Sequence, residues 1–162
     1  MANSLSFEVW PTSDLNEVWK IIGADGEQGE EVKITLTPEM QNVELYYEMS
    51  QQSTSEGWQF ADNGTFFVDA QDNFNYQVNS VVANAGKSMI VSISSLSSGQ
   101  TIPPDIAADM AANPDKVFVV NLITNNNFEI AYRLIAKNDH LNGNVRYFSQ
   151  DPRVIIDDPD IP

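Results

Sequence analysis

Short segments in which apolar and polar residues alternate run through most of this chain, and they constrain its fold more than any other feature. Leu5, Phe7 and Val9 are separated by polar residues, as are Val32 and Ile34. A period of two places one face of a strand in a core and the other in solvent. Such patterns, together with short runs rich in β-branched or aromatic residues, predict further strands at residues 43–49, 58–60, 65–68, 74–78, 89–93, 117–123, 128–136 and 145–148.

Two asparagine–glycine signals predict hairpins between these strands. Asn63 and Gly64 lie between aromatic runs, where an Asn-Gly pair favours the tight turn of a two-residue hairpin. A second such signal lies in residues 138–144. Residues 14–22 fit two structures, a short helix that starts after Ser13 or the second strand of a hairpin, and the β-branched residues at their end favour the strand.

One segment has helical character. Residues 104–112 begin with a proline, are rich in alanine and end before Asn113 and Pro114. We therefore predict an all-β fold, an antiparallel β-sandwich of roughly eight to ten strands with one short helix. A chain of 162 residues fits one domain, which we place at residues 1–156, followed by a polar C-terminal tail at residues 157–162.

The charge of the chain excludes several kinds of partner. The net charge is −15, and residues 1–80 carry fourteen acidic side chains against two lysines. Nucleic acid and anionic membranes attract basic proteins, so we expect neither as a partner. A basic protein remains a candidate partner, while solubility is the simpler explanation of the charge.

Cysteine is absent, which excludes disulfides, thiolate catalysis and cysteine-based metal sites. No apolar run approaches the roughly 18 residues that a membrane helix needs. The first residues show neither the basic nor the apolar part of a secretory signal. We therefore expect a cytoplasmic protein.

Catalytic chemistry has few candidates in this sequence. His140 is the only histidine, and it lies beside Asp139 in the second predicted hairpin turn, where exposure is the rule. The Gly-Lys-Ser triplet at residues 86–88 lacks the glycine five positions earlier that a phosphate-binding loop needs. We therefore expect no enzyme. A hydrolase built on two carboxylates is the catalytic class left open, and no particular pair of acids stands out.

Two segments gather oxygen-bearing side chains of the kind that calcium prefers. Asp69, Asp72 and Asn73 lie close together, and Asp62 and Asn63 form a second group. Neither group has the spacing of an EF-hand loop, and turn chemistry accounts for the same residue types. Calcium is the one cofactor that we retain, with the first three residues as its candidate ligands.

Carbohydrate binding requires an aromatic ring beside planar amides, and the sequence supplies both. An exposed Trp58 would offer a ring face to a sugar, whereas a buried Trp58 would belong to the core. Asparagine-rich segments would supply hydrogen bonds. The candidate ligand-binding residues are Trp58, Asp62, Asn63, Asn125, Asn126 and Asn127.

The C-terminal region contains an aromatic pair followed by Asp-Pro. Tyr147 and Phe148 lead through a short polar stretch to Asp151 and Pro152, and an apolar strand follows. A proline cannot donate to a ladder and an aspartate can accept backbone N–H bonds, so the motif predicts a structural corner with one ring in the core and one pointing outward. Together with residues 128–134, it resembles the ending of the AidA/PixA inclusion-body proteins of bacteria.

This resemblance implies a cytoplasmic, abundant, non-catalytic protein linked to inclusions. We therefore expect a binding or accumulating protein that self-associates, with a glycan as candidate ligand. Two other classes fit the sequence: a structural subunit of a phage or injection particle, and an acidic inhibitor or immunity protein for a basic partner. Symmetric oligomers, or tight salt-sensitive binding to a basic protein, distinguish these classes.

Overall fold

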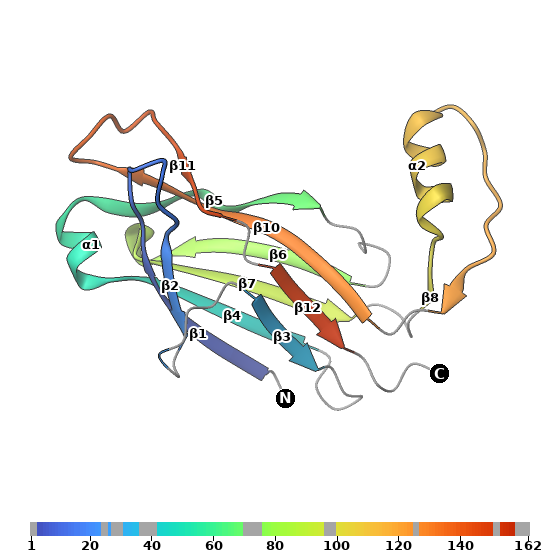
Figure 1. Ribbon diagram of the computed structural model, residues 1–162, viewed down its shortest axis with the longest axis horizontal. Coiled ribbons are helices and arrows are strands. Elements are labelled where there is room, and N and C mark those ends of the chain that lie inside the picture. Colours follow the sequence, from blue (N-terminus) through green and yellow to red (C-terminus); the bar gives the residue numbers. More distant parts are fainter. Residues whose placement is uncertain are drawn as a thin grey trace.

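Two β-sheets enclose the core of the molecule (Figure 1). The structure is a computed structural model, and it describes residues 3–23, 26, 31–35, 42–69, 76–95, 100–124, 127–150 and 153–157. The first sheet has the strand order β2 (Lys20–Gly23), β1 (Asn3–Trp10), β4 (Asn42–Met49), β7 (Ser88–Ser95), β6 (Tyr76–Ala83). The all-β, sandwich-like fold predicted from the alternating pattern is confirmed.

The long strand β10 (Asn127–Asn138) organises the second sheet. β5 (Trp58–Asp69) pairs antiparallel with its second half, and two short strands pair antiparallel with its two ends. These are β11 (Tyr147–Phe148) and β12 (Arg153–Asp157), and β3 (Glu31–Thr35) pairs parallel with β12. Asp157 therefore lies in a strand and not in the tail that we placed from that residue.

Two strand pairs, β1 with β4 and β3 with β12, are parallel, although the sequence predicted antiparallel sheets. The chain leaves the first sheet after β2, forms β3 in the second sheet and then returns to the first at β4. A strand that returns after such a crossing can run in its original direction, which a tight hairpin does not allow. The alternating pattern specifies strands but carries no information on this route.

The prediction of a hairpin at Asn63 and Gly64 is wrong. β5 runs through both residues, because the aromatic runs on either side pair with β10 and not with each other. Residues 61–64 stand opposite the single residue Ile135 and form a bulge. Positive φ angles of 60° at Asp62 and 88° at Gly64 make this geometry. A Cβ on Gly64 would lie 2.1 Å from the sulfur of Met89, so glycine is required there.

Other local predictions have mixed outcomes. The second hairpin is confirmed, because β10 and β11 pair antiparallel on either side of residues 139–146. Of the ambiguous segment at residues 14–22, only its end is a strand, and β2 pairs antiparallel with β1. A helical turn that we did not predict, α1 (Gln51–Ser55), begins after Ser50, whose side chain accepts the Ser53 N–H at 3.1 Å.

The helix predicted at residues 104–112 is confirmed as α2 (Pro104–Ala112). The strand predicted at residues 117–123 is mostly absent, since only β9 (Ile123–Thr124) pairs, with β8 (Gln100–Thr101). α2 is carried by this two-stranded ribbon and stands beside the sandwich (Figure 1). We call residues 100–124 the arm. A last short helix, η1 (Asn84–Gly86), connects β6 to β7.

The core lies between the sheets and follows the period of two. In β4, Val43, Leu45, Tyr47 and Met49 are buried, while the residues between them face outward or are half-buried. Full burial of such side chains stabilises a fold by about 1.5–3 kcal/mol each. The hydroxyls of Tyr47 and Tyr132, from opposite sheets, hydrogen-bond inside this core. No helix among the described residues has the length and apolar character needed to cross a bilayer.

Candidate functional site

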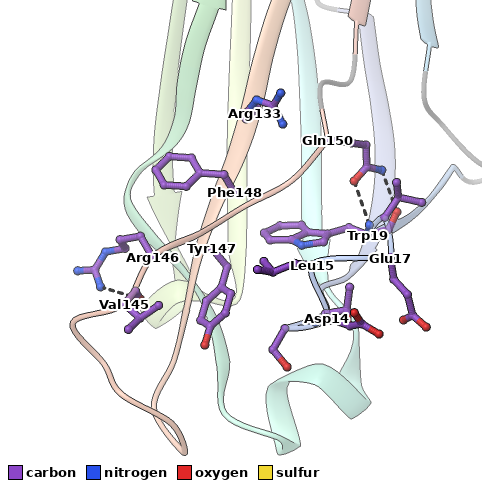
Figure 2. Close-up of a pocket in the computed structure, with 13 residues that line it drawn as sticks. Asp14, Leu15, Glu17, Trp19, Arg133, Val145, Arg146, Tyr147, Phe148 and Gln150 are labelled. Carbon is purple, nitrogen blue, oxygen red and sulfur yellow. Dashed lines mark hydrogen bonds between the residues drawn. The ribbon is translucent and has the colours of Figure 1, made fainter.

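A cleft of about 620 Å³ opens at one end of the sandwich, between two segments that are far apart in the sequence (Figure 2). One wall is the loop from β1 to β2, which supplies residues 12–15 and 17–19. The other wall consists of Arg133 on β10, residues 145–148 and Gln150. We call this the end cleft. Its volume is in the range of sites that hold a small molecule or a few side chains.

The end cleft has an aromatic base. Trp19 is buried at the end of the β1–β2 loop, and Tyr147 lies across from it on β11 (Figure 2). The Tyr147 ring packs edge-on against Trp58 with 5.0 Å between ring centroids. Because Trp58 is itself a core residue, this contact ties the position of the cleft wall to the packing of the sandwich.

Gln150 joins the two walls. The backbone N–H of Trp19 donates to Gln150 Oε1 at 2.9 Å, and Gln150 Nε2 donates to the backbone carbonyl of Trp19 at 2.9 Å (Figure 2). One side chain thus satisfies both backbone groups of Trp19, as a neighbouring strand would. This contact spans 131 positions of the sequence and holds the β1–β2 loop against the second sheet.

The mouth of the end cleft is apolar and exposed. Leu15 is 94% exposed and Phe148 is 48% exposed, and Val18 and Val145 are exposed beside them. Phe66 on β5 extends this surface, since its ring packs edge-on against Phe148 at 5.8 Å between centroids. Apolar side chains gathered from three separate segments are the kind of surface that marks an interaction site.

Charges of opposite sign lie on the two walls. Arg133 on β10 and Arg146, directly before β11, lie on one wall, whereas Asp14 and Glu17 belong to the β1–β2 loop (Figure 2). Arg146 Nε donates to Asp62 Oδ2 at 2.9 Å, and Arg133 Nη1 donates to the Ser149 carbonyl at 2.8 Å. The guanidinium groups are therefore held in place along their own wall. The cleft suits a ligand that is apolar in the middle and carries both signs of charge.

The sequence-predicted sugar site is not assembled by the residues that the structure describes. Trp58 is only 4% exposed, so it offers no ring face to a ligand and belongs to the core. Asp62 is exposed and bonds Arg146, while the Asn63 carbonyl accepts the Ser80 hydroxyl at 2.7 Å. Asn125 and Asn126 lie outside the described residues, and Asn127 is described only as part of the β10 backbone.

The predicted calcium ligands are also largely outside the described residues. Asp69 is described only through the backbone of β5, and Asp72 and Asn73 lie in the segment not described. Among the residues that are described, no group of three carboxylate or histidine side chains is placed to hold a metal ion. His140 is exposed, and its backbone N–H donates to Asn138 Oδ1 at 2.8 Å.

The two rings of the C-terminal aromatic pair differ in burial, since Tyr147 is half-buried and Phe148 is exposed. Tyr147 faces inward onto Trp58 and Phe148 faces outward. Asp151 and Pro152 lie outside the described residues, so the predicted corner stays a prediction. The sequence predictions missed one signal for the end cleft. Two apolar residues, Leu15 and Val18, lie among the polar residues of segment 12–18.

Comparison with known protein families gave a match to the N-terminal part of the chain. A family model, that of the DP-EP family, matches residues 4–106, which is more than half of the chain. No curated protein and no solved structure matched. The match covers the β1–β2 wall of the end cleft and stops before the β10–β11 wall. It also overturns the resemblance to the AidA/PixA proteins, which rested on the C-terminal region, whereas the family match lies in the N-terminal region.

Proposed function

This chain belongs to the DP-EP family, and we propose that it is a non-catalytic protein whose end cleft binds an extended, largely apolar polypeptide segment of another protein molecule. The observation that carries the proposal is the exposed apolar mouth of the cleft. Four side chains line it and are exposed to water, two from the β1–β2 loop and two from residues 145–148: Leu15, Val18, Val145 and Phe148. Covering apolar surface is favourable by about 25 cal/mol per Å².

A polypeptide fits the end cleft better than a small polar ligand does. The walls are open and apolar, and each wall carries charges of one sign, Asp14 and Glu17 on one side and Arg133 and Arg146 on the other. β11 lies at an end of its strand path, so its outer edge presents backbone groups to a further strand. An extended segment can bond to such an edge while its side chains enter the apolar mouth.

The test uses a panel of fluorescein-labelled decapeptides in which valine or phenylalanine alternates with threonine after an Asp-Lys pair. Fluorescence anisotropy of each peptide is measured against increasing concentrations of the full chain. We expect binding, and we expect Leu15→Asp to weaken it at least tenfold, because a carboxylate at the mouth must be desolvated against apolar residues. Leu15 is almost fully exposed, so the substitution leaves folding intact.

Val81→Asp is the matched control. Val81 is an exposed valine on β6, in the first sheet and outside the end cleft, so its substitution should leave peptide affinity unchanged. Equal weakening by Leu15→Asp and Val81→Asp would show charge repulsion by an acidic protein and not a site. No binding of any peptide in the panel would reject the proposed function.

A further inference from the structure

The arm carries two of the three most exposed large apolar side chains among the described residues. Val119 is 99% exposed and Val117 is 89% exposed, and no residue of α2 is buried. Phe118 and Val120, which alternate with these valines, are half-buried. Burial thus alternates along the segment as it does in a strand, with Val117 and Val119 on the exposed side.

The backbone of this segment runs from α2 to β9 without coiling and without pairing to a strand (Figure 1). Among the described residues, the stretch from residue 117 to residue 121 makes no backbone hydrogen bond, and pairing resumes only at Ile123 in β9. An extended apolar segment with free N–H and C=O groups is a template for another sheet. Such segments are bound in proteins by addition to the edge of a sheet.

The arm and the end cleft lie at opposite ends of the long axis of the molecule (Figure 1). α2 stands beyond the ends of β10 and β12, whereas β11 and the β1–β2 loop are at the other end. The arm of a molecule therefore does not fill the cleft of the same molecule. A second copy of the chain is the nearest source of an extended apolar segment.

We propose that the arm of one molecule inserts residues 115–121 into the end cleft of a second copy, so that the molecules assemble head to tail. This rests on the proposed function of the cleft and names its partner. Val117 and Val119 would contact the apolar mouth around Leu15 and Phe148, and the backbone between them would pair with the edge of β11.

The charges of the arm match those of the end cleft. Asp115 and Lys116 stand directly before the apolar segment and place both signs side by side. The cleft offers Arg133 on one wall and the carboxylates of Asp14 and Glu17 on the other, so each charge of the pair has a partner of opposite sign. Exposed pairs of this kind add up to about 1 kcal/mol each and mainly fix the register.

The symmetry of this contact predicts the form of the assembly. The two contacting surfaces are different, and each molecule carries one of each. Association therefore continues from copy to copy, giving open chains or a closed ring and not a dimer that stops. A single defective arm or cleft should end the growth at that point.

Two variants separate the contribution of the arm to assembly from that of the end cleft. Val119→Asp disables the arm and Leu15→Asp disables the cleft, and both positions are so exposed that the sandwich is unaffected. Sedimentation velocity is measured for the wild-type chain, each variant alone, and an equimolar mixture. We expect assemblies larger than a dimer for the wild type, and monomers for each variant alone. The mixture should give a heterodimer, because the Val119→Asp molecule keeps its cleft and the Leu15→Asp molecule keeps its arm.

Other outcomes overturn the inference in recognisable ways. A dimer of Leu15→Asp alone, with a monomer for Val119→Asp, would mean that arms pair with arms. A monomeric wild type would mean that the arm has no partner in its own chain. The labelled peptide of residues 114–123 separates this failure from that of the proposed function. If panel peptides bind the cleft and this peptide does not, the cleft is a peptide-binding site but the arm of a second copy is not its ligand.

Discussion

Tyr47 is the residue on which the packing of the two sheets can be tested most directly. Its ring stacks on Phe7 at 5.1 Å between centroids and meets Tyr132 edge-on at 6.5 Å. Burial raises the pKa of Tyr47, and the hydrogen bond with the Tyr132 hydroxyl only partly opposes this. A phenol with this environment keeps its proton in the folded chain at a pH where the unfolded chain loses it.

We expect a pH dependence of stability that Tyr47→Phe removes. Above a pH of about 10, where an ordinary tyrosine ionises, the unfolded state binds fewer protons than the folded state. The free energy of unfolding should therefore fall with rising pH, by up to about 1.4 kcal/mol per unit for this one group. Urea denaturation of the wild type and Tyr47→Phe at several pH values from about 9 to 11 measures the difference in slope.

Tyr46→Phe is the control for this measurement. Its hydrogen bond with Glu44, aided by desolvation and the carboxylate charge, raises the pKa of Tyr46 too, but this side chain faces solvent. Its variant should keep most of the alkaline loss of stability. Parallel slopes for the wild type and Tyr47→Phe would contradict a buried, protonated Tyr47.

At the scale of elements, Gln150 holds the β1–β2 loop in position. The loop contributes Leu15 and Val18 to the end cleft, yet few of its residues are buried. The two hydrogen bonds between Gln150 and the Trp19 backbone replace the ladder that a longer β2 would form. Loss of this side chain should loosen one wall of the cleft while the sandwich stays folded.

We expect Gln150→Ala to lower the free energy of unfolding by about 1–2 kcal/mol, since two part-buried backbone groups lose their hydrogen bonds to Gln150. Amide hydrogen exchange at Trp19 should accelerate, and peptide affinity should fall with it. Gln52→Ala on α1 is the control, because Gln52 is exposed and bonds only to nearby Glu56, at 3.2 Å. Unchanged exchange at Trp19 would show that something other than Gln150 holds the loop.

The elements also show what the sequence could predict. The signals for α2 are local, a proline at its start, alanines within and Asn113 with Pro114 at its end, and the helix lies where they place it. The burial of β4 follows its own alternation. The Asn63–Gly64 pair did not predict the structure correctly, because both strands of the expected hairpin pair with β10 and not with each other. The β10 residues lie some seventy positions further along the chain.

The end cleft could not be predicted for the same reason. Its walls come from residues 12–19 and 133–150, and the bond that joins them spans 131 positions. Neither wall carries a recognisable sequence motif, because exposed apolar residues and arginines can line a cleft at any spacing along the sequence. Trp58 attracted attention as an aromatic residue beside asparagines, but its neighbours in space, Tyr147 among them, place it in the core.

At the scale of the whole molecule, net charge opposes assembly. Each copy carries −15, so two copies repel each other at low ionic strength. Added salt shortens the range of this repulsion from about 30 Å at 0.01 M to about 8 Å at 0.15 M. The ion pairs at the arm are exposed and contribute about 1 kcal/mol or less, so the loss of repulsion should dominate.

Head-to-tail association should therefore strengthen as salt rises. Sedimentation equilibrium of the wild-type chain over a series of sodium chloride concentrations measures this, with Val119→Asp as the monomeric reference. An acidic inhibitor of a basic protein would behave in the opposite way toward its partner, because salt weakens attraction between opposite charges. Weaker self-association at higher salt would point to charge pairs, and not apolar contact, as its source.

The central claim is that the end cleft is the binding surface, and chemical-shift mapping tests it most directly. Isotope-labelled Val119→Asp chain, which keeps the cleft but cannot extend an assembly, is titrated with the tightest peptide of the alternating panel. We expect the largest shifts at Leu15, Val18 and residues 145–148, with β6 and β7 unaffected. Shifts centred on the first sheet, or none at saturating peptide, would contradict binding in the end cleft.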